Sequence, residues 1–223
     1  MKLLTISAFA TATLLIAATA QAAASDNFNR QDSSSLGSNW TLQSGTVGIS
    51  NNEAFGTDWS YATYNGASSS FVSFDVSLAG AGTSYVAGLL GLGGVDNAFV
   101  KVQQNGDLTG FDNYAFYDGN NRDGLFAPLS TAFDSAHIEI TLVGSIATLT
   151  ITPNIGGVQV YTHTYGFSST GTGVGLGFNG TGRADNFDTA VRSVPEPATW
   201  GLMIVGFGLV GVAARRRSVA VAA

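Results

Sequence analysis

The sequence predicts an all-β fold, an antiparallel β-sandwich, and three observations carry this prediction. Apolar residues recur at every second position along the middle of the chain, pairs of turn-forming residues separate these runs, and no apolar stripe of helical length recurs every 3.6 residues. Strands and turns spaced in this way are typical of a sandwich, whereas a β-solenoid would need an internal repeat, and none is present. Residues 25–192 suffice for one such domain with a sizeable core.

Each predicted strand has an apolar and a polar face. Residues 72–78 alternate Val, Phe, Val and Leu with Ser, Asp and Ser, and residues 137–142 alternate His, Glu and Thr with Ile, Ile and Leu. Because successive side chains of a strand point to opposite faces, one apolar set should line the core. The residues that we expect on such faces are Val72, Phe74, Val76, Leu78, Ile138, Ile140, Leu142, Leu149, Ile151, Val158, Val160, Val174, Leu176 and Phe178. Turns are expected at Asn51-Asn52, Asn65-Gly66, Asn105-Gly106, Asp118-Gly119, Asp123-Gly124, Pro153-Asn154 and Gly156-Gly157.

The composition excludes several classes of protein. Only 11% of the residues are charged and 45% are hydrophobic, which excludes a disordered acidic tail and a coiled coil. The chain has no cysteine, which removes thiol catalysis, zinc-thiolate sites and disulfides together. Residues 25–192 hold 14 Asp and Glu residues against 5 Lys and Arg residues, a net charge of −9. Nucleic-acid binding needs clustered cations, so we expect no nucleic-acid partner.

The first 24 residues have the layout of an export signal. Lys2 supplies the positive start, residues 3–20 are apolar or small, and small residues at Ala22 and at Ala24 offer two alternative cleavage sites. We therefore expect residues 1–24 to be a signal peptide that is removed on export by the secretion machinery. A first transmembrane helix is the alternative.

The other end of the chain has the pattern of a short membrane span. Residues 198–214 carry no charge and are followed directly by Arg215, Arg216 and Arg217. A helix of this length spans roughly 26 Å, slightly less than a hydrocarbon core of about 30 Å. The arginines would hold their end in the cytoplasm, and Trp200 would lie at the opposite interface. This arrangement places residues 25–192 outside the cytoplasm.

Residues 193–223 resemble the PEP-CTERM sorting signal of Gram-negative bacteria. The resemblance rests on the order of Pro195, Glu196 and Pro197, then Trp200, then the short Gly-rich apolar segment and the arginines. The stretch 195–208 is similar to the subtype that reads PEPxxWA and then MMIxGFG. It departs from that subtype at Gly201, where Ala is usual, and at Leu202, where Met is usual.

The resemblance implies how the protein is handled. A membrane peptidase of the exosortase type would recognise and cut the Pro-Glu-Pro region while the chain is anchored in the inner membrane. The body would then pass to the cell surface or to the exopolysaccharide matrix. A plain C-terminal membrane anchor is the alternative, and it places the body on the same side.

The two ends of the body carry a second resemblance, to concanavalin A-like and laminin-G-like jelly-roll domains. It rests on residues 26–30 (DNFNR), 36–40 (LGSNW), 174–178 (VGLGF) and 183–188 (RADNFD). It implies that the first and last strands pair and bury Phe28 and Phe187 together. It therefore narrows the predicted sandwich to a jelly roll, a fold that hosts lectins, glycosidases and inert modules alike.

No catalytic residues match a known pattern. A glycosidase needs two carboxyl groups, and the enzymes of this fold carry them as Glu-x-Asp-x-x-Glu on one strand. The body has two glutamates, Glu53 and Glu139, and neither begins that pattern. The alternation puts Glu139 and His137 on a solvent face. No G-x-S-x-G elbow is present. A pair of aspartates from different loops stays open.

One loop offers a candidate calcium site. Asp118, Asn120 and Asp123 supply oxygen donors, which Ca²⁺ prefers, but their spacing departs from an EF-hand and no closing Glu follows. Asn, Asp and Gly also simply build turns, which is the alternative. We expect no other cofactor.

Aromatic residues offer a candidate sugar site. Tyr161, His163 and Tyr165 should share one face of a strand, where flat rings could stack on a sugar; a half-buried sheet face is the alternative. Trp40 and Trp59 are expected in the core, with a concave face as the alternative.

These observations predict an exported, non-enzymatic protein of the cell surface or extracellular matrix, with a structural or adhesive sandwich. The first alternative is a lectin-like module that binds exopolysaccharide, with or without calcium. The second is a polysaccharide hydrolase or lyase, which would need a cleft with two carboxyl groups roughly 5 to 10 Å apart.

Overall fold

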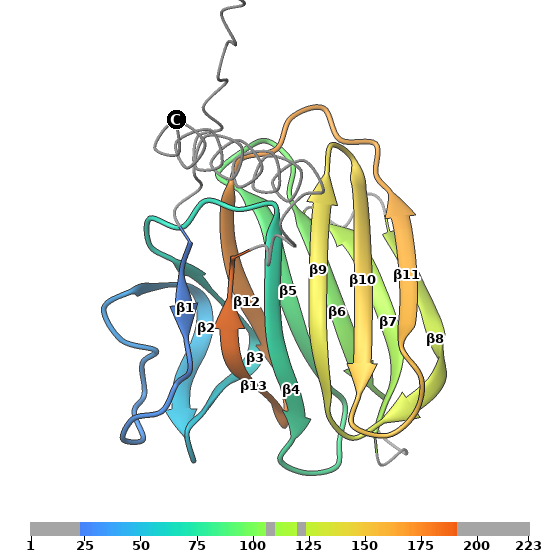
Figure 1. The fold of residues 1–223 in the computed structure, drawn as a ribbon. Helices are drawn as coiled ribbons and strands as arrows, with labels where there is room; N and C mark the ends of the chain where they lie inside the picture. Colours follow the sequence, from blue (N-terminus) through green and yellow to red (C-terminus); the bar gives the residue numbers. More distant parts are fainter. Residues whose placement is uncertain (1–22, 106–109, 120–123, 191–223) are drawn as a thin grey trace, which may run out of the picture.

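The computed structural model describes residues 23–105, 110–119 and 124–190, and every regular element in these ranges is a β-strand (Figure 1). The prediction of an all-β fold is therefore confirmed. The strands are β1 (Ser25–Asp26), β2 (Trp40–Ser50), β3 (Glu53–Tyr64), β4 (Phe71–Leu78), β5 (Ser84–Leu92), β6 (Ala98–Gln104), β7 (Phe111–Asp118), β8 (Gly124–Phe133), β9 (Ala136–Val143), β10 (Ile146–Pro153), β11 (Gln159–Thr164), β12 (Gly173–Asn179) and β13 (Gly182–Asp188).

The strands form one hydrogen-bonded path that is folded into two layers. Its order is β11-β10-β9-β4-β13-β3-β12-β5-β6-β7-β8, with β1 beside β13 and β2 beside β3. The path turns between β13 and β3, which share only two register pairs. In Figure 1 the layer of β4, β9, β10 and β11 lies in front of the layer of β5, β6, β7 and β8. The result is an antiparallel jelly-roll-like sandwich, as the sequence predicted.

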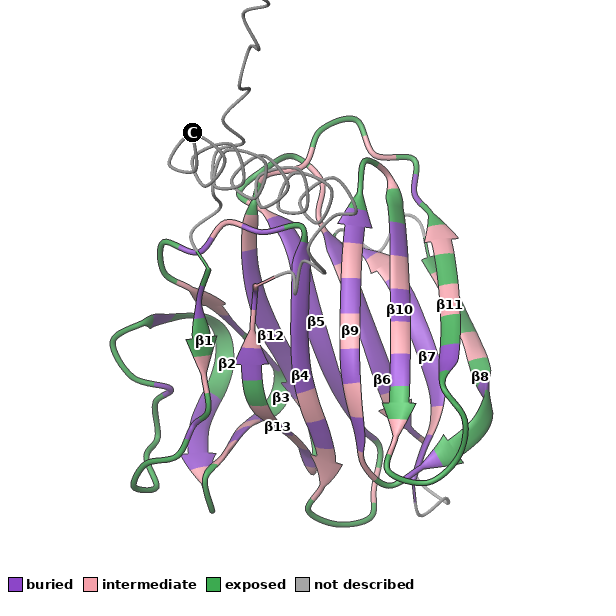
Figure 2. Ribbon diagram, viewed as in Figure 1, coloured by how far each residue is buried: buried purple, intermediate pink, exposed green. Residues whose placement is uncertain are grey.

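The core lies between the layers and follows the predicted alternation. In β9 and β10, buried positions alternate with half-buried or exposed ones, which gives the banding in Figure 2. Ile140 and Leu149 are fully buried. The layers approach so closely that a Cβ on Gly88 of β5 would lie 2.6 Å from Cδ1 of Ile140. A side chain there would have to displace the opposite layer, which explains the glycine.

The prediction for β11 is wrong about which of its faces is buried. Val158 and Val160 are 61% and 59% exposed. The opposite face, with Tyr161 and His163, turns inward onto β7. The physical reason is that aromatic rings bury more apolar area than valine does.

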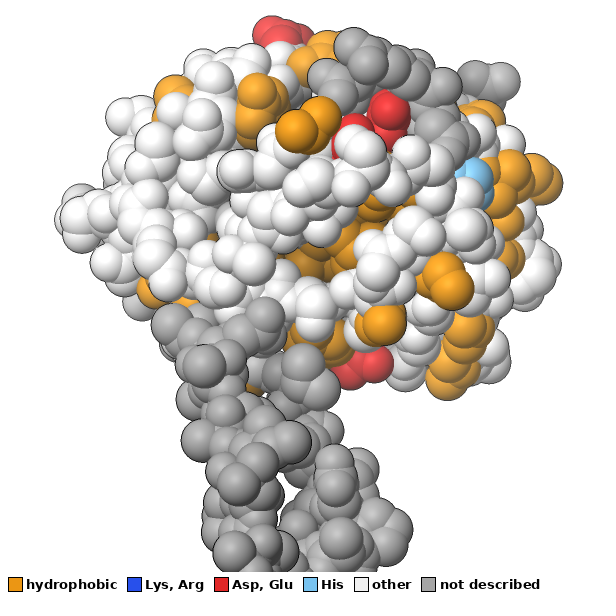
Figure 3. Space-filling model, turned by 90° about the horizontal axis from the view of Figure 1, so that it is seen from above, with side chains coloured by type: hydrophobic (Ala, Val, Ile, Leu, Met, Phe, Trp, Pro, Cys, Tyr) orange, Lys and Arg blue, Asp and Glu red, His pale blue; other side chains and the backbone are white. Residues whose placement is uncertain are grey.

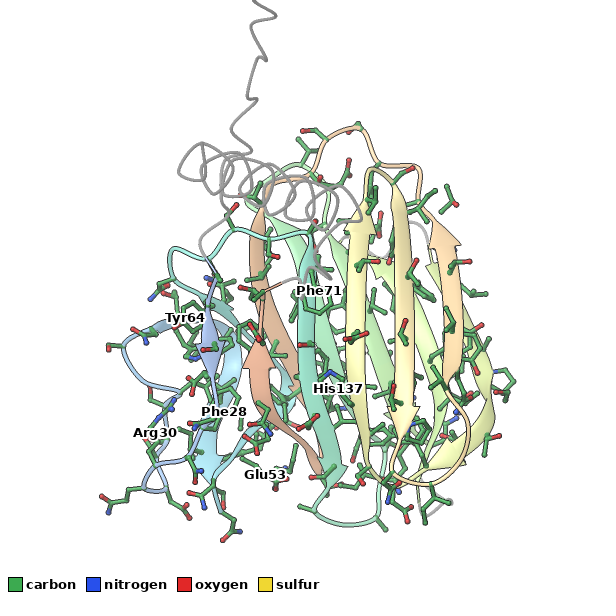
Figure 4. All side chains as sticks on the ribbon, in the orientation of Figure 1. Phe28, Arg30, Glu53, Tyr64, Phe71 and His137 are labelled. Atoms are coloured by element: carbon green, nitrogen blue, oxygen red, sulfur yellow. The ribbon has the colours of Figure 1, made fainter. Side chains whose placement is uncertain are left out.

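The first and last strands pair, as the jelly-roll resemblance implied. Asp26 of β1 faces Phe187 of β13 in the register, and Phe28 and Phe187 are both fully buried. The indole ring of Trp40 lies between them, 5.9 Å from Phe28 and 4.9 Å from Phe187 between ring centroids. The ring of Tyr64 stacks on Phe187 at 5.8 Å. These rings form the core of the region at the left of Figure 4.

Three predicted features lie outside the described residues. They are the signal peptide up to residue 22, the membrane span 198–214 with Arg215–Arg217, and the sorting residues Pro195, Glu196, Pro197 and Trp200. Among the residues that are described, no helix has the length and apolarity that a membrane span requires.

Candidate functional site

One row of residues crosses the outer face of the layer that contains β5, β6, β7 and β8, and it runs from β3 to β8. The register runs from Tyr61 through Gly177, Ala87, Lys101 and Ala115 to Phe126. Ala87 and Ala115 are small, so the Lys101 side chain stands in a trough. Larger side chains bound this trough, because Tyr85, Leu89, Phe99 and Tyr117 lie on the same faces of β5, β6 and β7.

A bulge in β3 presents Trp59 at this face. Asp58 and Trp59 both have positive φ, 51° and 56°, in a region that residues other than glycine seldom adopt. Ser60 holds the bulge, because its hydroxyl accepts a hydrogen bond from the Thr46 N–H at 2.9 Å and donates one to the carbonyl of Thr57. The pairing of β2 with β3 shifts register at the same place. The Trp59 side chain is left 64% exposed.

Three aromatic rings surround the ammonium of Lys101. Its Nζ lies 4.7 Å from the ring centroid of Tyr85, 5.4 Å from that of Tyr117 and 5.6 Å from that of Trp59. Lys101 is only 5% exposed, and no carboxylate of the described residues forms a salt bridge with it. Burial lowers the pKa of Lys101 to about 8. The rings compensate this buried charge in part through cation–π attraction.

Two hollows open on this face. The larger has a volume of about 580 Å³, and the smaller has about 310 Å³. Trp59, Tyr85, Lys101 and Tyr117 line both, so the two hollows together form one groove, which we call the aromatic groove. Its volume is in the range of small-molecule and sugar sites. Asp118 is the only carboxylate among its described lining residues.

A further hollow, which is polar and has a volume of about 900 Å³, lies on the outer side of the layer that contains β4 and β9. There His137 Nδ1 lies 2.6 Å from Asp75 Oδ1, and His137 Nε2 lies 3.9 Å from Glu139 Oε1. All three side chains are about 40% exposed, so the solvent face that the alternation predicted for His137 and Glu139 is confirmed (Figure 4). Burial, aided by the charges of Asp75 and Glu53, raises the pKa of Asp185 beside them. Asp26, Asp75 and Asp188 line this hollow together with His137.

The candidate calcium loop is described only at its start. Asp118 ends β7 and is buried, whereas Asn120 and Asp123 lie outside the described residues. In the part of the chain that the structure covers, no three His, Asp or Glu side chains gather as metal ligands would.

The three residues of the candidate sugar face point into the sandwich. The Tyr161 ring stacks on Tyr114 at 3.9 Å, and the Tyr161 hydroxyl donates to Gln159 Oε1 at 2.8 Å. His163 lies 5.7 Å from the ring of Phe116, and Tyr165 stacks on a further ring and is 3% exposed. Tyr161 and His163 thus pack against rings of β7, and Tyr165 is buried beside His163. This corresponds to the half-buried sheet face that the sequence left open as the alternative.

The sequence offered the groove position of Trp59 only as the alternative of a concave face, and it did not indicate Lys101 as a site residue. Trp40 lies in the core, as expected, but Trp59 does not, since it is an exposed ring beside Tyr85, 5.4 Å away between centroids. Lys101 drew no attention as a site residue. One signal for it was present, because Lys2 and Lys101 are the only lysines of the chain, and Lys101 stands between the apolar residues Val100 and Val102.

Comparison with solved structures places the fold among jelly rolls that include carbohydrate-active enzymes. The chain is similar to a β-glucanase of Bacillus licheniformis, with 12% identity and a TM-score of 0.52 over 76% of this chain and 98% of that one. It is also similar to a glycosidic hydrolase, with 11% identity and a TM-score of 0.52 over 78% of this chain and 97% of that one. At such identities the likeness shows the fold alone. No curated protein sequence matches the chain.

Comparison with protein families identifies the C-terminal segment. The model of the PEP-CTERM protein-sorting motif matches residues 193–217, which include the Pro-Glu-Pro triplet and the three arginines. A chain with this motif is exported and anchored through its C-terminus during sorting. The predicted resemblance is confirmed: the protein carries a PEP-CTERM sorting motif behind a jelly-roll-like β-sandwich.

Proposed function

We propose that this protein is a non-catalytic, polysaccharide-binding component of the cell surface or extracellular matrix. After export, an exosortase-type peptidase would cut the Pro-Glu-Pro region and release the sandwich from the inner membrane. The sandwich would then hold matrix polysaccharide in the aromatic groove. The sorting motif at residues 193–217 supports the first part of this proposal, and the groove supports the second.

The observation that carries the binding function is the exposure of Trp59. An indole ring that is 64% exposed forgoes much of the stabilisation that burial would bring. Two consecutive positive φ angles add a conformational cost of roughly 1 kcal/mol or more each. A fold that keeps such a ring beside Tyr85 and over a hollow is well suited to stacking on a sugar ring.

Binding without hydrolysis is favoured by the acidic residues of the groove. Both known glycosidase geometries need two carboxyl groups across the scissile bond. The described lining of the aromatic groove offers Asp118 alone, and the sequence lacks the Glu-x-Asp-x-x-Glu pattern. A purely structural sandwich that binds no polysaccharide is the remaining alternative. The glycan-binding experiment described next also tests this alternative.

The test is a glycan array probed with the body of the protein, followed by calorimetry on the best ligand. We expect Trp59→Ala to weaken saccharide binding about tenfold or more. The reason is that the stacking of one ligand ring on an aromatic side chain contributes roughly 1–3 kcal/mol. Ile155→Ala is the matched control, because Ile155 is 80% exposed and lies outside the groove. The array is run with and without a chelator, which also tests calcium. If the unmodified protein binds no glycan, the binding function is wrong.

The sorting part is tested by mass spectrometry of the mature C-terminus. Surface material from cells with the sorting peptidase should end near Pro195–Pro197, and cells without the peptidase should retain the tail. An intact tail through Ala223 in surface material of normal cells would contradict processing.

A further inference from the structure

We infer that the aromatic groove selects acidic saccharides, polymers that carry uronic-acid carboxylates, and that Lys101 is the residue that reads the carboxylate. This inference rests on the proposed function and deepens it, because it names the class of polysaccharide. It depends on the place of Lys101 in the groove and on what surrounds its ammonium.

Lys101 occupies the middle of the groove. It lines both hollows and lies in the register between Ala87 and Ala115, whose small side chains leave space on either side of it. A saccharide that stacks on Trp59 and continues toward Phe126 would pass directly over this position. A lysine with this placement can contact a substituent of the sugar ring that lies over it.

The ammonium lacks an anionic partner within the described residues. The groups around it are the phenols of Tyr85 on β5 and Tyr117 on β7 and the indole of Trp59 on β3. Burial raises the pKa of Tyr85, so this phenol stays neutral at physiological pH. Asp118 also lines the hollow of about 580 Å³, and the salt bridges among the described residues, Arg30–Asp26, His137–Asp75 and His137–Glu139, do not include Lys101.

A buried cation that has no counter-ion among the described residues is costly, and an anionic ligand would remove that cost. Desolvation is the cause of the lowered pKa of Lys101. A ligand carboxylate at hydrogen-bond distance would pair with the charge where water is largely excluded, and a charge-assisted hydrogen bond of this kind is stronger than a neutral one. A neutral sugar hydroxyl would compensate the charge less.

The location of this cation is specific. The body has an excess of acidic residues, and Lys101 is its only lysine. In the view from above in Figure 3, the described side chains include Asp and Glu but no Lys or Arg. The net charge of −9 of residues 25–192 disfavours a general attraction to polyanions, so a carboxylate would be recognised at one position of the groove.

The experiment uses ligand pairs that differ only in charge. One pair is a cello-oligosaccharide and its C6-carboxylated form, and the other is an oligogalacturonate and its methyl ester. At pH 6.5 we expect the acidic member to bind at least about tenfold more tightly, and Lys101→Met to remove this preference while stacking on Trp59 remains. The preference should be constant below pH 8 and decline above it, because Lys101 loses its proton there.

A second readout uses the unmodified protein and does not depend on a variant that folds. After removal of the signal peptide, Lys101 is the only lysine, so ¹³Cε-lysine labelling yields one resonance whose titration reports its pKa. The acidic ligand should raise this pKa toward 10.5, and the neutral ligand should leave it near 8.

The outcomes separate the two proposals. Equal affinity for both members of a pair, or a pKa that the acidic ligand does not move, overturns the role of Lys101 and leaves the binding groove intact. Binding of neither member of any pair, together with a blank glycan array, overturns the groove itself.

Discussion

Asp26 links the first strand to the turn that follows it. Its carboxylate accepts hydrogen bonds from both Nη atoms of Arg30, at 2.6 and 2.9 Å, and from Trp40 Nε1 at 2.8 Å. It also accepts the N–H of Phe28 at 2.9 Å. Burial by itself would raise the pKa of Asp26, but these hydrogen bonds and the charge of Arg30 outweigh burial, so the pKa is lowered. The ionised form therefore stabilises the fold.

We expect Asp26→Asn to lower the free energy of unfolding at pH 7 by about 2 kcal/mol, since the amide NH₂ would face a donor. Because the folded pKa is lowered, the contribution of Asp26 is present above its ordinary pKa of 3.8 and is lost as the pH falls below that value. Urea unfolding between pH 2 and 7 checks this. Asp134→Asn is the control, because Asp134 is exposed. If Asp26→Asn and Asp134→Asn lower the free energy of unfolding by the same amount, Asp26 does not have this stabilising role.

Lys101 gives a pH dependence of the same sign, but in a window at higher pH. Its pKa is about 8 in the folded chain and 10.5 in a solvated lysine, so between these values the unfolded chain binds the proton and the folded chain does not. The stability contribution of Lys101 therefore rises with pH through this window. Lys101→Met should flatten the dependence and raise stability below pH 8. If the stability of this variant still rises with pH between about 8 and 10.5, groups other than Lys101 cause the rise.

At the scale of elements, the bulge of β3 matters most for the groove. Ser60 is 1% exposed, and its hydroxyl is the only side-chain group of the described chain that bridges Thr46 and Thr57. Without it the Thr46 N–H would lose its partner, and the strained residues Asp58 and Trp59 would lose their support.

We expect Ser60→Ala to lower the free energy of unfolding by about 1–2 kcal/mol and to weaken saccharide binding as well. Thr57→Ala is the control, because its side chain is exposed in the same bulge. Denaturant unfolding measures the first effect and calorimetry measures the second. Unchanged affinity in Ser60→Ala would mean that the bulge does not position Trp59.

At the scale of the whole molecule, the two ends of the sandwich are joined. The N–H of Ala24 donates to Thr189 Oγ1 at 2.8 Å, and the N–H of Thr189 donates to the Ala24 carbonyl at 2.9 Å. Ser69 Oγ also donates to the Thr189 carbonyl at 2.9 Å, and Ala24 is buried. Ala24 thus belongs to the folded body, although the predicted signal peptide included it.

We therefore expect export processing after Ala22, so that the mature chain begins at Ala23. Intact-mass analysis of the exported protein measures this directly. A chain that begins at Ser25 should unfold at a temperature several degrees lower than one that begins at Ala23, because Thr189 would lose its hydrogen bonds to Ala24. A mature protein that begins at Ser25, with equal thermal stability, would contradict this expectation.

Much of the fold could be predicted from the sequence because the alternation of side chains along a strand is a local property. Ile138 and Ile140 face the core in β9 as the alternation predicted, whereas the joint burial of Phe28 and Phe187 beside the paired first and last strands was implied by the jelly-roll resemblance. The same alternation could not decide which face of β11 is covered, because Val160 and Tyr161 are both apolar enough to be buried.

The candidate site was harder to predict because it combines residues that are distant in the chain. Trp59, Tyr85, Lys101 and Tyr117 come from four strands, and no motif links them. The groups that the sequence did bring together, such as Tyr161 with His163, share a strand face, and in the sandwich that face is turned inward.

The sequence by itself determined the strand content of this protein and its sorting motif, because period-two alternation and a short linear signal are both contained in neighbouring residues. Only the tertiary structure decided which faces meet water, that Trp59 stands outside the core, and that three aromatic rings lie around the Lys101 ammonium. The physical reason is that burial depends on the opposite layer, and the packing of two layers is a property of the whole chain.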